Sequence, residues 1–448
     1  MPQTDFSGAP VSTTNRTSIE GLDRAFALFQ GYFNDPLAEI DDVLAADPDF
    51  VMGHCFRAGL FLISSEKAAV PELEASVAEI EKRVDQANER ERGHLAAAKA
   101  WLAGDFHGAA ERYGDVLSTY PRDAIAMQFA HQCDFLLGQS RMLRDRVAWV
   151  LPHWAPNEPT WGYLQGMYAF GLEEMGHYGE AERAAQASIE MNPRDAWGVH
   201  ALAHILEMQG RTSEGIDFLE STSDNWSPEN GFAFHNWWHL ALYYLDQRDF
   251  GRVLDLYDRS IHPEASDVLM ELVDAASLLW RLQLAGHDVG DRWTDVVETY
   301  KGATKDGYYA FNDMHAMMAF VSTGRRDAAE QVMSTLVKRA GDNDSNGQMT
   351  REVGLPVCRA IEAFDRGDYD AVIESLRPVR LIASRFGGSN AQRDVLDWTL
   401  VEAAFRGGRQ GLAEALINER TARKPESSMA RWFKTRVTAN TANVETAA

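Results

Sequence analysis

Apolar residues recur along this chain at the three- and four-residue spacing of an α-helix, and the runs come in pairs. The clearest pairs are HLAAAKAWLAGDFHGAAERYGDVLSTYPRD (94–123) and MYAFGLEEMGHYGEAERAAQASIEMNPRD (167–195). Each has a central glycine, where a helix can end in the left-handed conformation, and a proline near its end, which cannot continue a helix. Each segment is therefore predicted to form two helices joined by a tight turn.

Both segments match the tetratricopeptide pattern of helical repeats. Weaker copies follow over residues 196–219, 234–263, 311–336, 360–376 and 400–425. Nothing reads as a run of alternating strands. We predict an all-α fold, a tetratricopeptide-like α-solenoid in which antiparallel helix pairs stack as a right-handed superhelix and bury their apolar faces against their neighbours.

The repeats predict one helical domain over residues 17–434. Residues 1–16 and the tail 435–448 have no periodic apolar pattern, so both are expected to be disordered.

Composition excludes some classes of partner. The chain has 67 acidic against 43 basic residues, and its formal charge of -24 repels nucleic acid and anionic lipid surfaces, so neither is expected as a partner. It has no stretch of about 20 apolar residues. Its three cysteines, Cys55, Cys133 and Cys358, lie far apart, as in a reduced compartment. We expect a soluble cytoplasmic protein.

Six stretches between residues 140 and 394 resemble the tetratricopeptide repeat protein 38 family: SRMLRDRVAWVLPHW, GYLQGMYAFGLEEMGHY, DAWGVHALAHILEMQGR, FHNWWHLALYYLD, NDMHAMMAF and GGSNAQRD. Ordinary tetratricopeptide arrays do not carry these histidine and tryptophan phrases. The resemblance implies a curved helical-repeat protein in which the first helix of each pair lines a concave groove. It implies no particular reaction.

Two histidine pairs, each with a spacing of four residues, stand out in HALAH (200–204) and HNWWH (235–239). Successive side chains turn about 100° around an α-helix, which places His200, His204, Glu207 and Trp197 on a face away from the expected packing stripe. The same reasoning turns His235, Trp238 and His239 toward the groove and Trp237 toward the core. Other residues expected to line the groove and contact a ligand are Tyr163, Phe170, Glu173 and His315.

Two histidines one helical turn apart can both offer a ring nitrogen to one metal ion. His200, His204, His235 and His239 are therefore candidate ligands for zinc, manganese or iron. Neither pair has the glutamate of an H-E-x-x-H zinc protease. Glu207 either completes a ligand set or orients an imidazole from outside it.

Three functions remain open from the sequence. We favour binding of a small molecule or short peptide in the groove. The alternative is a hydrolase or lyase, metal-dependent or acid–base, with His204, Glu207 and His239 as candidate catalytic residues. The third is a protein scaffold. Arg393, beside Gly387 and Gly388, either clamps a carboxylate or phosphate of the ligand or belongs to a structural loop.

Overall fold

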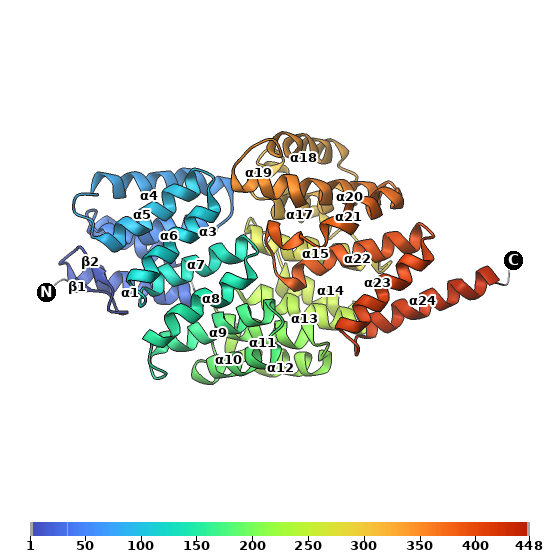
Figure 1. Cartoon of the computed structure of the whole chain (residues 1–448), viewed down its shortest axis with the longest axis horizontal. Helices are drawn as coiled ribbons and strands as arrows, with labels where there is room; N and C mark the ends of the chain where they lie inside the picture. Colours follow the sequence, from blue (N-terminus) through green and yellow to red (C-terminus); the bar gives the residue numbers. More distant parts are fainter. Residues whose placement is uncertain (1–2, 34, 446–448) are drawn as a thin grey trace. The chain divides into compact units, whose positions relative to one another are not determined.

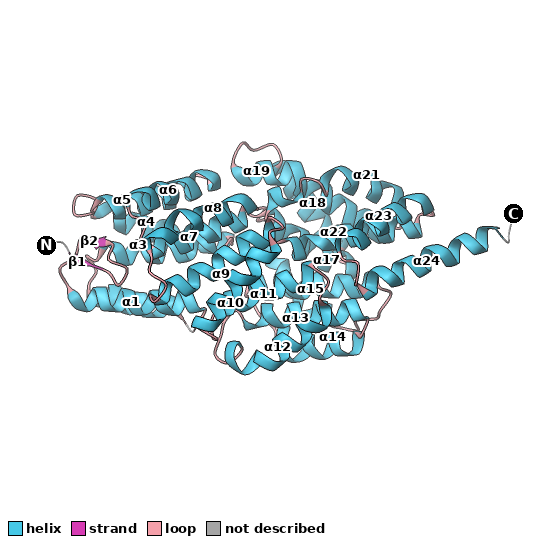
Figure 2. Cartoon of the chain, turned by 60° about the horizontal axis from the view of Figure 1, so that its bottom comes forward, coloured by secondary structure: helices cyan, strands magenta, loops and turns pink. Residues whose placement is uncertain are grey.

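The computed structural model describes residues 3–33 and 35–445, and most of this part of the chain is helical (Figure 1, Figure 2). Contacts divide it into two compact units. Unit 1 comprises residues 1–202, 224–232 and 343–346, and unit 2 comprises residues 203–223, 233–342 and 347–448. In the described residues, no helix combines the length and the apolar character needed to cross a membrane.

Unit 1 begins with a two-stranded antiparallel hairpin and continues with consecutive helices. The elements are β1 (Gln3–Thr4), β2 (Pro10–Val11), α1 (Arg16–Gly31), α2 (Pro36–Ala46), α3 (Val51–Ile63), η1 (Lys67–Ala69), α4 (Val70–Lys82), α5 (Glu89–Leu102), α6 (Phe106–Thr119), α7 (Ala124–Leu136), α8 (Ser140–Val150), η2 (Leu151–His153), α9 (Pro159–Glu174) and α10 (Tyr178–Met191). Three helices contribute residues to both units, namely α11 (Ala196–Met208), α12 (Thr212–Trp226) and α19 (Ser345–Met349).

Unit 2 contains the second half of the repeat pattern. Its elements are α13 (Ala233–Gln247), α14 (Phe250–Leu256), the π-helix η3 (Tyr257–Ile261), α15 (Leu269–Leu284), α16 (Trp293–Tyr300), η4 (Lys301–Ala303), α17 (Ala310–Ser322), α18 (Arg326–Arg339), the π-helix η5 (Thr350–Gly354), α20 (Leu355–Asp365), α21 (Tyr369–Val379), η6 (Ala383–Phe386), α22 (Asn390–Arg406), α23 (Gln410–Arg423) and α24 (Ser428–Glu445).

The predicted helix pairs are confirmed. Helices α5 and α6 pack together, as do α9 and α10, and these are the two segments in which the pattern is clearest (Figure 1). Gly104 and Gly176 end the first helix of each pair with φ of +79° and +78°, a conformation that glycine adopts without steric cost. In unit 2, α13 packs with α14, α17 with α18, α20 with α21 and α22 with α23. The fold is all-α, built from stacked helix pairs.

The predicted domain organisation stays a prediction, to which the structure adds three observations. One continuous domain was expected over residues 17–434, whereas the described chain forms two compact units. The N-terminal segment was expected to be disordered, but residues 3–11 form a hairpin that buries Ala9 and Val11. The tail was expected to be disordered from residue 435, but α24 continues to Glu445, and residues 446–448 lie outside the described part.

A buried ion-pair network attaches this hairpin to the helices of unit 1. Arg90 on α5 donates to Asp123 through two nitrogens, at 2.6 and 2.9 Å, and forms an ion pair of 2.8 Å with Asp5. His94 lies 2.9 Å from the same Asp123 carboxylate. Asp123 also caps α7 by accepting a hydrogen bond from the backbone N–H of Ala126. The short hairpin is therefore held by charge pairing, which a hydrophobicity pattern does not reveal.

We predict that Asp123→Ala lowers the free energy of unfolding by about 3–5 kcal/mol, because the buried Arg90 guanidinium loses its bidentate partner. Urea unfolding followed by helical circular dichroism measures this loss. The matched control is Asp115→Ala, which breaks an exposed pair with Arg112 and should change stability by less than about 0.5 kcal/mol. Equal losses in the two variants would contradict a stabilising role for the network.

Candidate metal centre

Three of the predicted histidines come together in unit 2. His204 lies on α11, and His235 and His239 lie one turn apart on α13. One ring nitrogen from each can be chosen so that the nitrogens lie within 4.8 Å of one another. The ring centroids of His204 and His239 are 4.4 Å apart, and those of His235 and His239 are 4.9 Å apart. We call these three residues the histidine cluster.

A hydrogen bond next to the cluster fixes α13 against the end of α11. The hydroxyl of Tyr243 on α13 donates to the carbonyl of Ala203, at 2.6 Å. Ala203 directly precedes His204, and Tyr243 lies one turn after His239. This bond therefore sets the separation of the two helices at the level where the imidazoles meet.

Two carboxylates orient the cluster from outside. The Nδ1–H of His235 donates to Asp274 on α15, at 2.6 Å, and the Nδ1–H of His239 donates to Glu207 on α11, at 3.2 Å. Histidines that bind metals have this arrangement, because a carboxylate on one ring nitrogen fixes the tautomer and makes the other nitrogen a better ligand. In both residues the nitrogen on the opposite side of the ring is Nε2.

The surroundings of His239 favour its neutral form. Burial lowers the pKa of His239 well below its ordinary value, and positive charge on His204 and His235 would lower it further. Burial raises the pKa of the Asp274 carboxyl, against the opposing effect of His235. Neutral imidazole is the form that binds a metal ion.

The prediction of an open groove is wrong for these side chains, because all three histidines are buried. A helical angle separates core from groove only where a helix such as α13 is packed on one side. In unit 2 it packs against α14 and also against α15 and α24. The centre is therefore enclosed, which suits an ion better than a peptide.

The two tryptophans of HNWWH exchange their predicted roles. Trp238, expected in the groove, is fully buried, and its ring stacks on His235 with centroids 5.3 Å apart. Its indole N–H donates to the hydroxyl of Ser277, at 3.1 Å. Trp237, expected in the core, is half-buried. The core position moves by one residue because α15 covers the face that the prediction left open.

His200, Trp197 and Phe170 form an aromatic group within unit 1. His200 stands one turn before His204 on α11, as the sequence predicts. Its ring lies 5.2 Å from Phe170, 4.8 Å from Trp197 and 5.2 Å from Phe232, measured between centroids. All of these side chains are buried, so the expectation that they face an open groove is also wrong.

Other predicted ligand-binding residues have structural partners. The Tyr163 hydroxyl accepts a hydrogen bond from Asn192, and burial raises its pKa to about 12. Glu173 is buried on α9. The Nδ1–H of His315 donates to the backbone carbonyl of Phe311, at 2.8 Å, and burial lowers its pKa to about 3. His315 is not in the histidine cluster.

Arg393 belongs to its own loop. Its guanidinium donates to the carbonyls of Gly387 and Gly388 and to the Asn390 side chain. These contacts support the structural interpretation of the glycine-rich stretch.

Sequence reasoning missed Asp274 and Arg281, both on α15. An aspartate and an arginine within the apolar run LMELVDAASLLWRLQL are the signal that was available, because a charge at a core position of a helix requires a partner. Nothing in the sequence identifies His235 as the partner of Asp274, which lies 39 residues further along.

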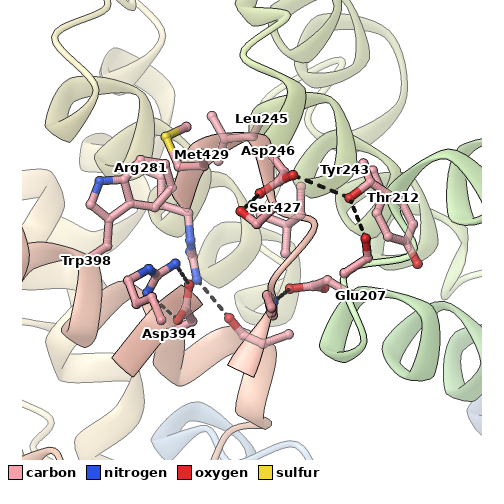
Figure 3. Close-up of a pocket in the computed structure, with 15 residues that line it drawn as sticks. Glu207, Thr212, Tyr243, Leu245, Asp246, Arg281, Asp394, Trp398, Ser427 and Met429 are labelled. Atoms are coloured by element: carbon pink, nitrogen blue, oxygen red, sulfur yellow. Dashed lines mark hydrogen bonds and ion pairs between the residues drawn. The ribbon is translucent and has the colours of Figure 1, made fainter. Parts of the chain in front are cut away.

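A pocket opens beside the cluster, within unit 2 (Figure 3). The hollow has a volume of about 520 Å³ when the open solvent at its mouth is counted with it. Glu207 lies in its wall and joins the two sites, because one carboxylate oxygen accepts from His239 and the other from Lys424, each at 3.2 Å. Of the two sequence-based alternatives for Glu207, the contacts support a residue that orients an imidazole.

No family model matches this chain. Solved structures similar to it include the Cut9 and Hcn1 hetero-tetramer of the APC/C, with a TM-score of 0.43 and 14% identity over 94% of this chain and 76% of the other. A human IFIT1 dimer with m7Gppp-AAAA has a TM-score of 0.40 and 14% identity, and covers 96% of each chain. The P58(IPK) TPR domain has a TM-score of 0.22 and 17% identity over 88% of this chain and 99% of the other. Likenesses at this level carry no argument, and the helical-repeat fold rests on the helix pairs of the chain itself.

We predict that Trp238→Ala lowers the free energy of unfolding by about 3–5 kcal/mol, since it empties a core position and removes the ring that stacks on His235. Trp237→Ala is the matched control, with an expected loss of about 1 kcal/mol. Thermal and urea unfolding of both variants measure the difference. A larger loss in Trp237→Ala would restore the sequence-based assignment of the core residue.

Proposed function

We propose that unit 2 binds a divalent transition-metal ion through His204, His235 and His239. The observation that carries the proposal is the pair of carboxylates, Asp274 and Glu207, which hold Nδ1 of two of the three imidazoles. Packing alone does not require a buried and a half-buried carboxylate to orient two neighbouring histidines. A metal centre does, because its ligands must present fixed tautomers.

Zinc is the first choice among the three metals predicted from the sequence. Neutral imidazoles suit zinc and iron better than manganese, which prefers oxygen ligands. Zinc binds histidine nitrogens at about 2.0–2.1 Å, so nitrogens within 4.8 Å of one another need only a small approach to surround one ion. Three protein ligands leave a fourth position for water or another group. We also propose His200 as a fourth ligand, because it lies one helical turn before His204.

Catalysis is the second candidate, favoured by the position of Glu207 between the histidine cluster and the pocket. A zinc-bound water with a lowered pKa would act as a nucleophile in a hydrolase, and the same ion would polarise a substrate in a lyase. In this proposal His204 and His239 hold the ion and Glu207 positions His239.

The resemblance to the tetratricopeptide repeat protein 38 family also remains a proposal, carried by the six stretches quoted above. The kind of partner is likewise a proposal. We propose a small molecule rather than a peptide, because the histidine cluster is enclosed and charged side chains converge on the pocket of unit 2.

We predict that protein purified without a histidine tag contains, or takes up from a zinc-buffered solution, about one zinc ion per chain. His204→Ala and His239→Ala should lower the zinc affinity by at least about tenfold, and Asp274→Asn by about 10–100-fold, because each removes a ligand or its orienting group. Elemental analysis and competition with a chromophoric chelator measure the affinity.

The matched control is His262→Ala. His262 is also a buried histidine of unit 2 with a carboxylate partner, Glu271, at 2.7 Å, but it lies outside the cluster. It should bind zinc like the wild type. If wild-type protein takes up no zinc, or if His262→Ala loses as much affinity as His239→Ala, the proposed centre is wrong.

A further inference from the structure

Arg281 is a buried cation without a carboxylate partner in the described part of the chain. Its side chain is about 1% exposed and lies in the wall of the pocket of unit 2 (Figure 3). The guanidinium donates only to backbone carbonyls, those of Ser277 at 3.1 Å, Ala391 at 2.9 Å and Gln392 at 3.2 Å. These bonds use Nη1 and Nη2, and Nε has no acceptor among the described residues.

The nearby carboxylates are engaged by other groups. Asp394 makes a bidentate pair with Arg420, at 2.6 and 2.9 Å. Glu207 accepts from Lys424 and His239.

Asp246, the third acidic residue of the wall, holds the start of α24. It accepts from the hydroxyl of Ser427 and the backbone N–H of Ser428. Of the three cations that line the pocket, Arg281 is therefore the one without an ion pair.

Burial of Arg281 disfavours its charged form. Loss of solvation lowers its pKa to about 10, although the carboxylates of Asp394 and Glu207 act in the opposite direction. Buried arginine is normally paired with a carboxylate or phosphate that matches its planar fork. An anion from outside would supply the missing partner.

Part of the wall is apolar. Leu242, Leu245, Trp398 and Met429 line the pocket and are nearly fully buried. The Arg281 guanidinium also lies 5.5 Å from the ring of Trp238, which stabilises the cation. A fixed cation in a wall that also contains these apolar side chains suits an anion that carries an apolar group.

We infer that this pocket binds a small organic anion, whose carboxylate or phosphate group pairs with Arg281 and whose apolar part lies against Trp398 and the leucines. Lys424 at the wall adds a second positive charge. The inference does not depend on a metal ion, because every residue that carries it lies outside the histidine cluster.

The test uses the full chain after treatment with a chelator, so that a failure of the metal proposal does not affect it. Isothermal titration calorimetry compares benzoate, phenyl phosphate and inorganic phosphate with uncharged benzamide. We expect saturable binding of benzoate or phenyl phosphate, weaker binding of inorganic phosphate and none of benzamide. The preferred head group then identifies the ligand as a carboxylate or a phosphate.

Variants of Arg281 test whether its guanidinium contacts the bound anion. Arg281→Gln should weaken the better anion by at least about tenfold, and Arg281→Lys by less, because lysine keeps the charge but not the fork. The matched control is Arg146→Gln in unit 1. Arg146 is also buried and also lies beside a tryptophan, but it is paired with Asp134.

A second measurement covers the case in which Arg281 variants do not fold. A crystal of the wild type soaked with 4-bromobenzoate should show an anomalous bromine peak beside Trp398, with the carboxylate against Arg281. Binding of benzamide as tight as that of benzoate, unchanged affinity in a folded Arg281→Gln, or a bromine peak only outside the pocket would each overturn the inference.

Discussion

A charged or titratable side chain that is buried between helices destabilises the fold by several kcal/mol unless another group in the protein pairs with it. This constraint explains several buried polar contacts in the two units. In unit 1, Arg90 is balanced by Asp123 and Asp5, which attach the N-terminal hairpin. In unit 2, Asp274 is balanced by His235, which attaches α15 to α13. The polar contacts thus determine which helices lie against one another where apolar packing alone would allow several registers.

The same constraint shows how much could be read from the sequence. Helix pairs depend on local spacing and on glycines such as Gly104, so they were predicted correctly. The histidines were singled out because two pairs with the same spacing occur on neighbouring repeats, and three of the four meet in unit 2. Their environment could not be predicted, because it depends on α15 and α24, which follow α13 later in the chain.

The exchange of Trp237 and Trp238 illustrates this limit. A helical angle measures the direction of a side chain relative to one assumed packing face. When a helix is covered on two sides, as α13 is, that angle no longer separates core from surface. Asp274 was missed for a related reason, since its partner lies 39 residues away and no local pattern connects them. Long-range pairing of buried charges is the information that one sequence does not contain.

Glu207 shows why the histidine cluster and the pocket should be considered together. One of its oxygens accepts from His239 and the other from Lys424, so a single carboxylate is shared by an imidazole of the cluster and a cation of the pocket. Among the described residues, Glu207 is therefore the one side chain that contacts both His239 of the cluster and Lys424 of the pocket wall through the hydrogen bonds described above. Its two oxygens are both engaged, so its orientation depends on α13 and on the residues before α24 together.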